Sequence, residues 1–129
     1  MTHLLQHVDG PAGVRPAEGH TQFPAGLTTA ATWDKELIYN RSRVMGQEFY
    51  DLGKHNIRYR CCRVRLLIRS CSTAGVNVAL TPVTGGPMGR APAAGRNWEG
   101  WFADPYATGI AGYLSVKGIQ DAGVIATAK

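Results

Sequence analysis

The sequence predicts an α/β fold in which parallel strands are joined by crossover helices. Three short apolar segments of strand length alternate with two longer segments whose apolar residues recur at helical spacing. The resulting order of strand, helix, strand, helix, strand is typical of a parallel sheet. The length of 129 residues suits one domain, and its 16 glycines and 7 prolines predict many turns and loops.

The chain opens with a short apolar strand over residues 4–8. This strand runs into the turn-rich motif DGPAGVR, residues 9–15. Residues 16–31 have the glycine and proline content of a loop, so we expect no regular element there.

The first helix follows this loop. Thr32 or Asp34 can cap its first turn, and Gly53 is a natural end. Six apolar residues recur at helical spacing between these limits: Leu37, Ile38, Val44, Met45, Phe49 and Leu52.

The C-terminal half repeats the pattern. Residues 75–80, GVNVAL, alternate in the manner of a strand and are followed by a long loop over residues 81–103. The second helix opens with Asp104 as its cap and a proline at its first position, and Gly123 ends it. A last apolar strand, VIATA, covers residues 124–128. Three apolar residues of the helix lie on or near one face: Ile110, Leu114 and Ile119.

Polar side chains follow the carboxyl ends of the predicted strands, where ligands bind in such sheets. The motif DGPAGVR places Asp9 and Arg15 six positions apart. Both can form paired hydrogen bonds to a ligand with neighbouring hydroxyls. The alternative is an Asp that caps its own turn and an Arg on the surface, and spacing alone favours this alternative.

The motif GRNWEG places Arg96, Asn97, Trp98 and Glu99 in one loop. Planar polar groups beside an indole suit a sugar, whose hydroxyls take directional bonds and whose C–H face packs on an aromatic ring. The alternative is a loop held together by an internal Arg–Glu pair, and spacing favours neither. For Trp98 itself we expect a role in packing the loop.

Several functions are disfavoured by composition. The three cysteines lack metal-binding spacing, and His3 and His7 have no third ligand nearby, so we predict no metal site. No apolar run approaches the ~20 residues of a membrane span. The N-terminus also lacks the charged and long apolar regions of a signal peptide.

Residues 54–74 differ in composition from the rest of the chain. They contain all three cysteines, six of the 14 basic residues and no acidic residue. Outside this segment eight basic residues face nine acidic ones, a net charge of −1, so the basic character is local. An arginine-rich arm of this kind suggests nucleic-acid binding, but no stacking platform or recognition helix accompanies it.

Long collinear motifs resemble the N-terminal domain of glycoside hydrolase family 3, with the fungal β-glucosidases nearest in appearance. They are DGPAGVR, FPAGLTTAATWD, GVNVALTPVTGGPMGRAPAAGRNWEGWFADPYATG and GIQDAGVIATAK. The resemblance covers residues 8–53 and 75–129, which is nearly everything outside the basic segment.

The resemblance implies the fold and the activity of a parent enzyme. The family's first domain is a (β/α)₈ TIM-type barrel, of which residues 1–129 would form an incomplete part. The family hydrolyses terminal β-linked glucose from cellobiose, oligosaccharides or aryl glucosides with retention of configuration. No cofactor is implied, the partner is a β-glucoside rather than nucleic acid or a membrane, and secretion of the parent enzyme is expected. The oligomeric state is left open.

The resemblance also assigns roles to four residues. Asp9 would accept hydrogen bonds from sugar hydroxyls in the terminal subsite, and Arg15 and Arg96 would lie beside it as donors. Lys129 matches the lysine of the family motif AKHF, whose histidine lies past the chain end. The nucleophilic Asp and the acid/base Glu also lie beyond the chain end, so the 129-residue fragment is expected to be inactive. A catalytically dead carbohydrate-binding remnant is the other alternative.

Residues 54–74 interrupt a junction that is continuous in the family, where EFYDLG leads almost directly into GVNVAL. We interpret the segment as an insertion that does not belong to the fold, and an unspliced intron is our hypothesis for its origin. Sequencing of the mature transcript tests this hypothesis, because a mature message that contains these codons contradicts it.

Overall fold

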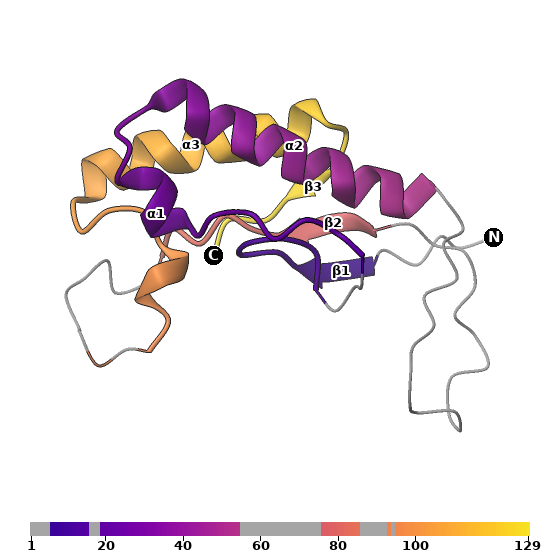
Figure 1. Cartoon of the computed structure of the whole chain (residues 1–129), viewed down its shortest axis with the longest axis horizontal. Coiled ribbons are helices and arrows are strands. Elements are labelled where there is room, and N and C mark those ends of the chain that lie inside the picture. The colour runs from indigo at the N-terminus through magenta and orange to yellow at the C-terminus, as the bar shows by residue number, and fades with distance from the viewer. Residues whose placement is uncertain (1–5, 16–18, 55–75, 86–92, 94) are drawn as a thin grey trace.

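A computed structural model describes residues 6–15, 19–54, 76–85, 93 and 95–129. Within these residues, three parallel strands form one sheet in the order β1-β2-β3, and the two long helices α2 and α3 pack together on one face of it (Figure 1). The α/β fold with parallel strands and crossover helices is therefore confirmed. The elements are β1 (Gln6–Asp9), α1 (Gly26–Ala30), α2 (Lys35–Lys54), β2 (Val76–Leu80), η2 (Asn97–Glu99), α3 (Pro105–Asp121) and β3 (Ile125–Ala126).

The strand boundaries differ slightly from expectation. Asp9 belongs to β1 because it pairs with Leu80 in the parallel ladder, whereas residues 4 and 5 lie outside the described residues. The last strand is shorter than residues 124–128, although the amide of Thr127 still donates to the carbonyl of Ala79 at 3.0 Å. The sheet therefore continues as single hydrogen bonds toward the C-terminus.

The prediction of a pure loop over residues 16–31 is wrong, because this segment contains the short helix α1. Thr29 donates its hydroxyl to the carbonyl of Ala25 at 3.0 Å, which supports the single turn. A Cβ added at Gly26 would lie 2.6 Å from the carbonyl oxygen of Gly100, so only a glycine lets α1 approach the loop that contains η2. A five-residue helix is too short to show helical periodicity in the sequence.

The predicted helix caps are confirmed. The Asp34 carboxylate accepts from the amides of Glu36 and Leu37 at 2.9 and 3.1 Å, and Thr32 accepts from the amide of Asp34. Asp104 accepts from the amide of Ala107 at 2.6 Å. Each carboxylate satisfies amides that have no partner inside the helix. The first helix ends one residue later than expected, at Lys54.

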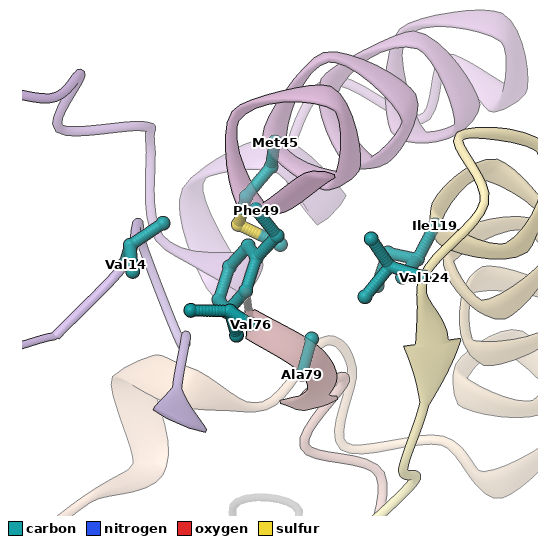
Figure 2. Close-up of a cluster of buried hydrophobic side chains, with 7 residues drawn as sticks. All are labelled: Val14, Met45, Phe49, Val76, Ala79, Ile119 and Val124. Carbon is teal, nitrogen blue, oxygen red and sulfur yellow. The ribbon is translucent and has the colours of Figure 1, made fainter. Parts of the chain in front are cut away.

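The main core lies between α2, α3 and the sheet. Figure 2 shows Met45 and Phe49 pointing from α2 toward Val76 and Ala79 of β2, with Ile119 and Val124 closing the cluster from the other side. Two residues that share the helical spacing are exposed instead, Leu37 by 44% and Val44 by 54%. Each directly precedes a buried residue, and one position turns a side chain about 100° around a helix, away from this core.

Small residues allow α2 and α3 to pack closely. A Cβ on Gly118 would lie 2.7 Å from the carbonyl oxygen of Tyr39, and a Cβ on Gly46 would lie 2.9 Å from the Cα of Ile119. Between these points the hydroxyl of Ser42 donates to that of Ser115 at 2.9 Å, and both side chains are buried. The buried face of α3 is thus made largely of small residues, while Ile110 and Leu114 are only half-buried.

Residues 55–75 lie outside the described residues, so the insertion over residues 54–74 stays a prediction apart from Lys54, which ends α2. Within the described ranges, no helix combines the length and the apolar character that a membrane crossing requires.

Candidate functional site

Charged side chains from three segments meet at the carboxyl edge of the sheet. Asp9 ends β1, Arg96 lies in the loop after β2, and Lys129 follows β3. The backbone of Lys129 is held by the segment that follows β2. Its amide donates to the carbonyl of Pro82, and its carbonyl accepts from the amide of Gly85 at 2.7 Å. The carboxyl ends of parallel strands lie at the same edge of a sheet, and this determines the backbone positions of these residues.

Asp9 and Lys129 form an ion pair across the middle strand. The Lys129 Nζ donates to the Asp9 Oδ1 at 2.7 Å, although the two residues are 120 positions apart in sequence. Their strands flank β2 and are therefore separated by roughly 10 Å, a gap that the long lysine side chain bridges. The Asp9 carboxylate thus pairs across the sheet, which differs from the alternative of an Asp capping its own turn.

Three cations influence the pKa of the Asp9 carboxyl. The hydrogen bond from Lys129 is the main reason that the pKa of Asp9 lies below its ordinary value, and modest burial opposes this shift. The charges of Lys129, Arg96 and Arg15 lower it further. All four sequence-predicted site residues therefore interact electrostatically at one point, and Asp9 stays ionised near neutral pH as a hydrogen-bond acceptor.

Arg15 is placed by the compact turn that follows β1. Its amide donates to the carbonyl of Asp9 at 3.0 Å, which closes the turn. The turn depends on Gly13, whose φ of +136° disfavours other residues. The exposed guanidinium of Arg15 lies over the ring of Trp98, 5.8 Å from its centroid. This contact joins the turn to the loop that carries Arg96.

Arg96 is held by the carboxylate three positions later. Its Nε and Nη2 donate to the two oxygens of Glu99, each at 2.9 Å, and this bidentate pair raises the pKa of Arg96. The Glu99 side chain is only 4% exposed, whereas that of Arg96 is 65% exposed. The internal Arg–Glu pair is therefore present, and much of the Arg96 side chain remains exposed to solvent.

The packing role expected for Trp98 stays a prediction, and Trp101, three positions later, is the more deeply buried tryptophan. Trp101 is buried in a second core cluster with Ala30 and Ile38, whereas Trp98 is exposed at the site and contacts Arg15. Sequence reasoning assigned a role to Trp98, inside the polar motif, but none to Trp101. The glycine between them and the apolar Phe102 that follows are the available signals that the loop turns inward at Trp101.

The site has the chemistry of a binding surface for a neutral polyhydroxyl molecule. It offers one ionised acceptor, Asp9, among three donor cations, and an aromatic ring beside them. A general acid requires a raised pKa, and the pKa of Asp9 is lowered. In the described part of the chain, no three His, Cys, Asp or Glu side chains are grouped so that they could hold a metal ion.

Comparisons with known proteins show that the chain is similar to β-glucosidases. No family model matches the chain. It is 45% identical over 121 residues to probable beta-glucosidase A of Aspergillus terreus, a match that takes in 94% of the chain and 11% of that relative. A glycoside hydrolase family 3 β-glucosidase from Neurospora crassa has a similar structure, with 42% identity and a TM-score of 0.77 over 97% of the chain and 12% of its own.

A bacterial structure extends the similarity beyond fungi. Beta-glucosidase 3B of Thermotoga neapolitana, solved in complex with glucose, is 28% identical with a TM-score of 0.65 over 97% of the chain and 15% of its own. The relatives are β-glucosidases, so the nucleic-acid-binding and carbohydrate-binding-remnant alternatives gain no support from them. The chain spans about 11% of the length of the A. terreus relative. It corresponds to a segment of the N-terminal barrel domain of fungal glycoside hydrolase family 3 β-glucosidases.

Proposed function

We propose that this chain supplies part of the glucose-binding wall of a retaining β-glucosidase. The proposal rests on one observation, which is that at the carboxyl edge of the sheet Asp9 is paired with Lys129 and is influenced by the charges of Arg96 and Arg15. Barrel enzymes bind their substrates at this edge. The glucose complex of the Thermotoga relative supports the choice of ligand.

Each group has a role that follows from its hydrogen-bonding capacity. Asp9 accepts from two neighbouring sugar hydroxyls, while Arg15, Arg96 and Lys129 donate to hydroxyl oxygens. Asp9 accepts from Lys129 at 2.7 Å, and both side chains are partly exposed and therefore open to a ligand. A bound sugar exchanges part of this ion pair for charge-assisted hydrogen bonds, which are stronger than neutral ones.

Bond cleavage in the parent enzyme requires further groups. Retaining glycosidases use two carboxyl groups about 5–5.5 Å apart, one as nucleophile and one as acid/base. Asp9 is paired with Lys129, and Glu99 is buried in two bonds to Arg96, so both carboxylates are already occupied. We infer that these residues hold the terminal glucose of a β-glucoside while other parts of the parent enzyme cleave the bond.

Isothermal titration calorimetry with glucose tests the proposal on the full chain. We expect weak, saturable binding that Asp9→Asn reduces by about tenfold, because the amide lacks the charge and one acceptor. Asp121→Asn is the matched control, since Asp121 also pairs with a lysine at 2.9 Å but lies at the end of α3, at the opposite edge of the sheet. Equal loss of affinity in both variants, or no binding by the unaltered chain, contradicts the proposal.

A further inference from the structure

Arg41 is a buried cation in the middle of α2. It lies three residues after Ile38 and four before Met45, on the stripe of the helix that faces the interior, and it is only 7% exposed. Burial lowers the pKa of its guanidinium to about 10. A buried charge is costly unless its hydrogen-bond donors are satisfied, so the contacts of this side chain explain its presence.

The guanidinium contacts three separate segments. Its Nη2 donates to the carbonyl of Pro11 at 2.9 Å, and its Nε donates to the carbonyl of Pro24 at 2.8 Å. Its plane lies over the ring of Trp101, 5.6 Å from the centroid. One rigid planar group therefore fixes two backbone carbonyls and an indole at the same time.

Each contacted residue is connected to a segment of the candidate site, either along the chain or by packing. Pro11 lies inside the turn between Asp9 and Arg15. Trp101 follows Glu99, which holds Arg96, by two residues. Pro24 directly precedes the N-cap of α1, and that helix packs against the loop containing η2 (Figure 1).

We propose that Arg41 is a positioning residue that fixes the two sugar-binding loops relative to each other, an inference that rests on the proposed function of those loops. It does not touch the sugar. It sets the distance between the turn that carries Asp9 and Arg15 and the loop that carries Arg96. Small displacements of such groups have large effects on binding and catalysis, because several hydrogen bonds must form at once.

The chemistry of the contacts requires arginine at this position. A lysine at position 41 has no plane to stack on Trp101, and its single ammonium nitrogen replaces two donors that point in different directions. A methionine fills similar volume but leaves the carbonyls of Pro11 and Pro24 without these donors. A lysine at position 41 would therefore lose part of these contacts, and a methionine would lose both hydrogen bonds.

The test compares Arg41→Met and Arg41→Lys with Arg43→Met, an exposed arginine on the same helix. Glucose affinity is measured by calorimetry, and the titration midpoint of the Asp9 carboxyl is measured by ¹³C NMR in each soluble full-length variant. We expect Arg41→Met to weaken glucose binding by about tenfold or more. We also expect it to raise the titration midpoint of Asp9 by about half a pH unit, because Asp9 moves away from the cations that lower its pKa. Arg41→Lys is intermediate, and Arg43→Met changes neither quantity.

Each outcome decides the inference. A folded Arg41→Met chain with unchanged glucose affinity and an unchanged Asp9 midpoint shows a purely structural arginine and overturns it, even when the chain is less stable. If Arg41→Met does not fold, Arg41→Lys is read by the same two criteria. If neither folds, proton exchange of the Arg41 Nε–H in the unaltered chain decides, and exchange as fast as that of Arg43 contradicts the inference.

This test also separates the inference from the proposed function. If the unaltered chain binds no glucose, the proposed function fails, and the Asp9 midpoint alone then decides whether Arg41 positions the turn. A raised midpoint in Arg41→Met still supports the positioning role, and an unchanged midpoint overturns it.

Discussion

The interior beneath α2 and α3 and the carboxyl edge of the sheet are built on opposite principles. In the interior, Met45, Phe49 and Ile119 are completely buried, and glycines bring the two helices into contact. At the edge, Asp9, Arg96 and Lys129 are partly or largely exposed and are held by ion pairs. The interior is specified by shape, whereas the edge is specified by charges that a ligand can compete for.

The two regions therefore contribute differently to stability and to function. Loss of a large buried side chain removes burial and leaves a cavity, which costs several kcal/mol. An exposed ion pair contributes only about 0–1 kcal/mol, because water and salt screen it. Substitutions in the interior should unfold the chain, and substitutions at the edge should change binding in a chain that stays folded.

The largest expected effect is that of Phe49→Ala. Phe49 is completely buried and lies against Gly10, at the start of the turn that contains Arg15. We expect a loss of about 3–5 kcal/mol in the free energy of unfolding, measured by urea denaturation followed by circular dichroism. Val44→Ala, an exposed position on the same helix, should change it by no more than about 0.5 kcal/mol. Similar losses in both variants would contradict the described core.

A smaller effect is expected where α2 and α3 touch. A Cβ on Gly118 would meet the backbone of Tyr39 and Arg43 at 2.7 and 2.9 Å, so Gly118→Ala must separate the helices and should cost about 1–3 kcal/mol. Gly109→Ala in the same helix has nothing within 4 Å of the added Cβ and should stabilise the chain by about 0.5–1 kcal/mol. Thermal unfolding midpoints that move in the same direction for both variants would refute the close contact.

Sequence reasoning succeeded where one residue type has one physical role. Aspartates before helices and a proline at the first helical position predicted both caps, because few residues satisfy free amides. The alternation of strands and helices predicted the parallel sheet, because crossover connections leave few other arrangements. The positions of polar residues after the strands predicted that they share one edge of the sheet, since parallel strands end together, whereas the roles of individual residues came from the family resemblance.

Sequence reasoning failed where a contact depends on precise distances. The Asp9–Lys129 ion pair requires the order of strands in the sheet, which the sequence does not state. The close face of α3 is made of glycine, serine and alanine, which a search for apolar periodicity passes over. Arg41 stands on the buried stripe of α2, and a cation at a core position is the signal that could have drawn attention to it.

The smallest expected effect on stability is that of Asp9→Asn. The folded-state pKa of Asp9 is lowered by Lys129 and the two arginines, so its ionised form stabilises the folded chain. This contribution is present above the ordinary pKa, about 4, and is lost as pH falls through the lowered folded-state value. We expect at most about 1 kcal/mol between the unaltered chain and Asp9→Asn at pH 7, and a smaller difference near pH 2.5. A difference that grows toward low pH would show that the sign of the interaction is wrong.

The most direct test of the shared edge site is an NMR titration of the full chain with glucose. The signals to follow are the Asp9 carboxyl, the Lys129 ammonium and the Arg96 guanidinium, with Lys117 and Asp121 at the opposite edge as internal controls. The account predicts that all three edge signals shift with a single common dissociation constant while the two control signals stay in place. Edge signals that do not shift, that follow separate constants, or that move no more than Lys117 and Asp121 would contradict a single glucose-binding site at this edge.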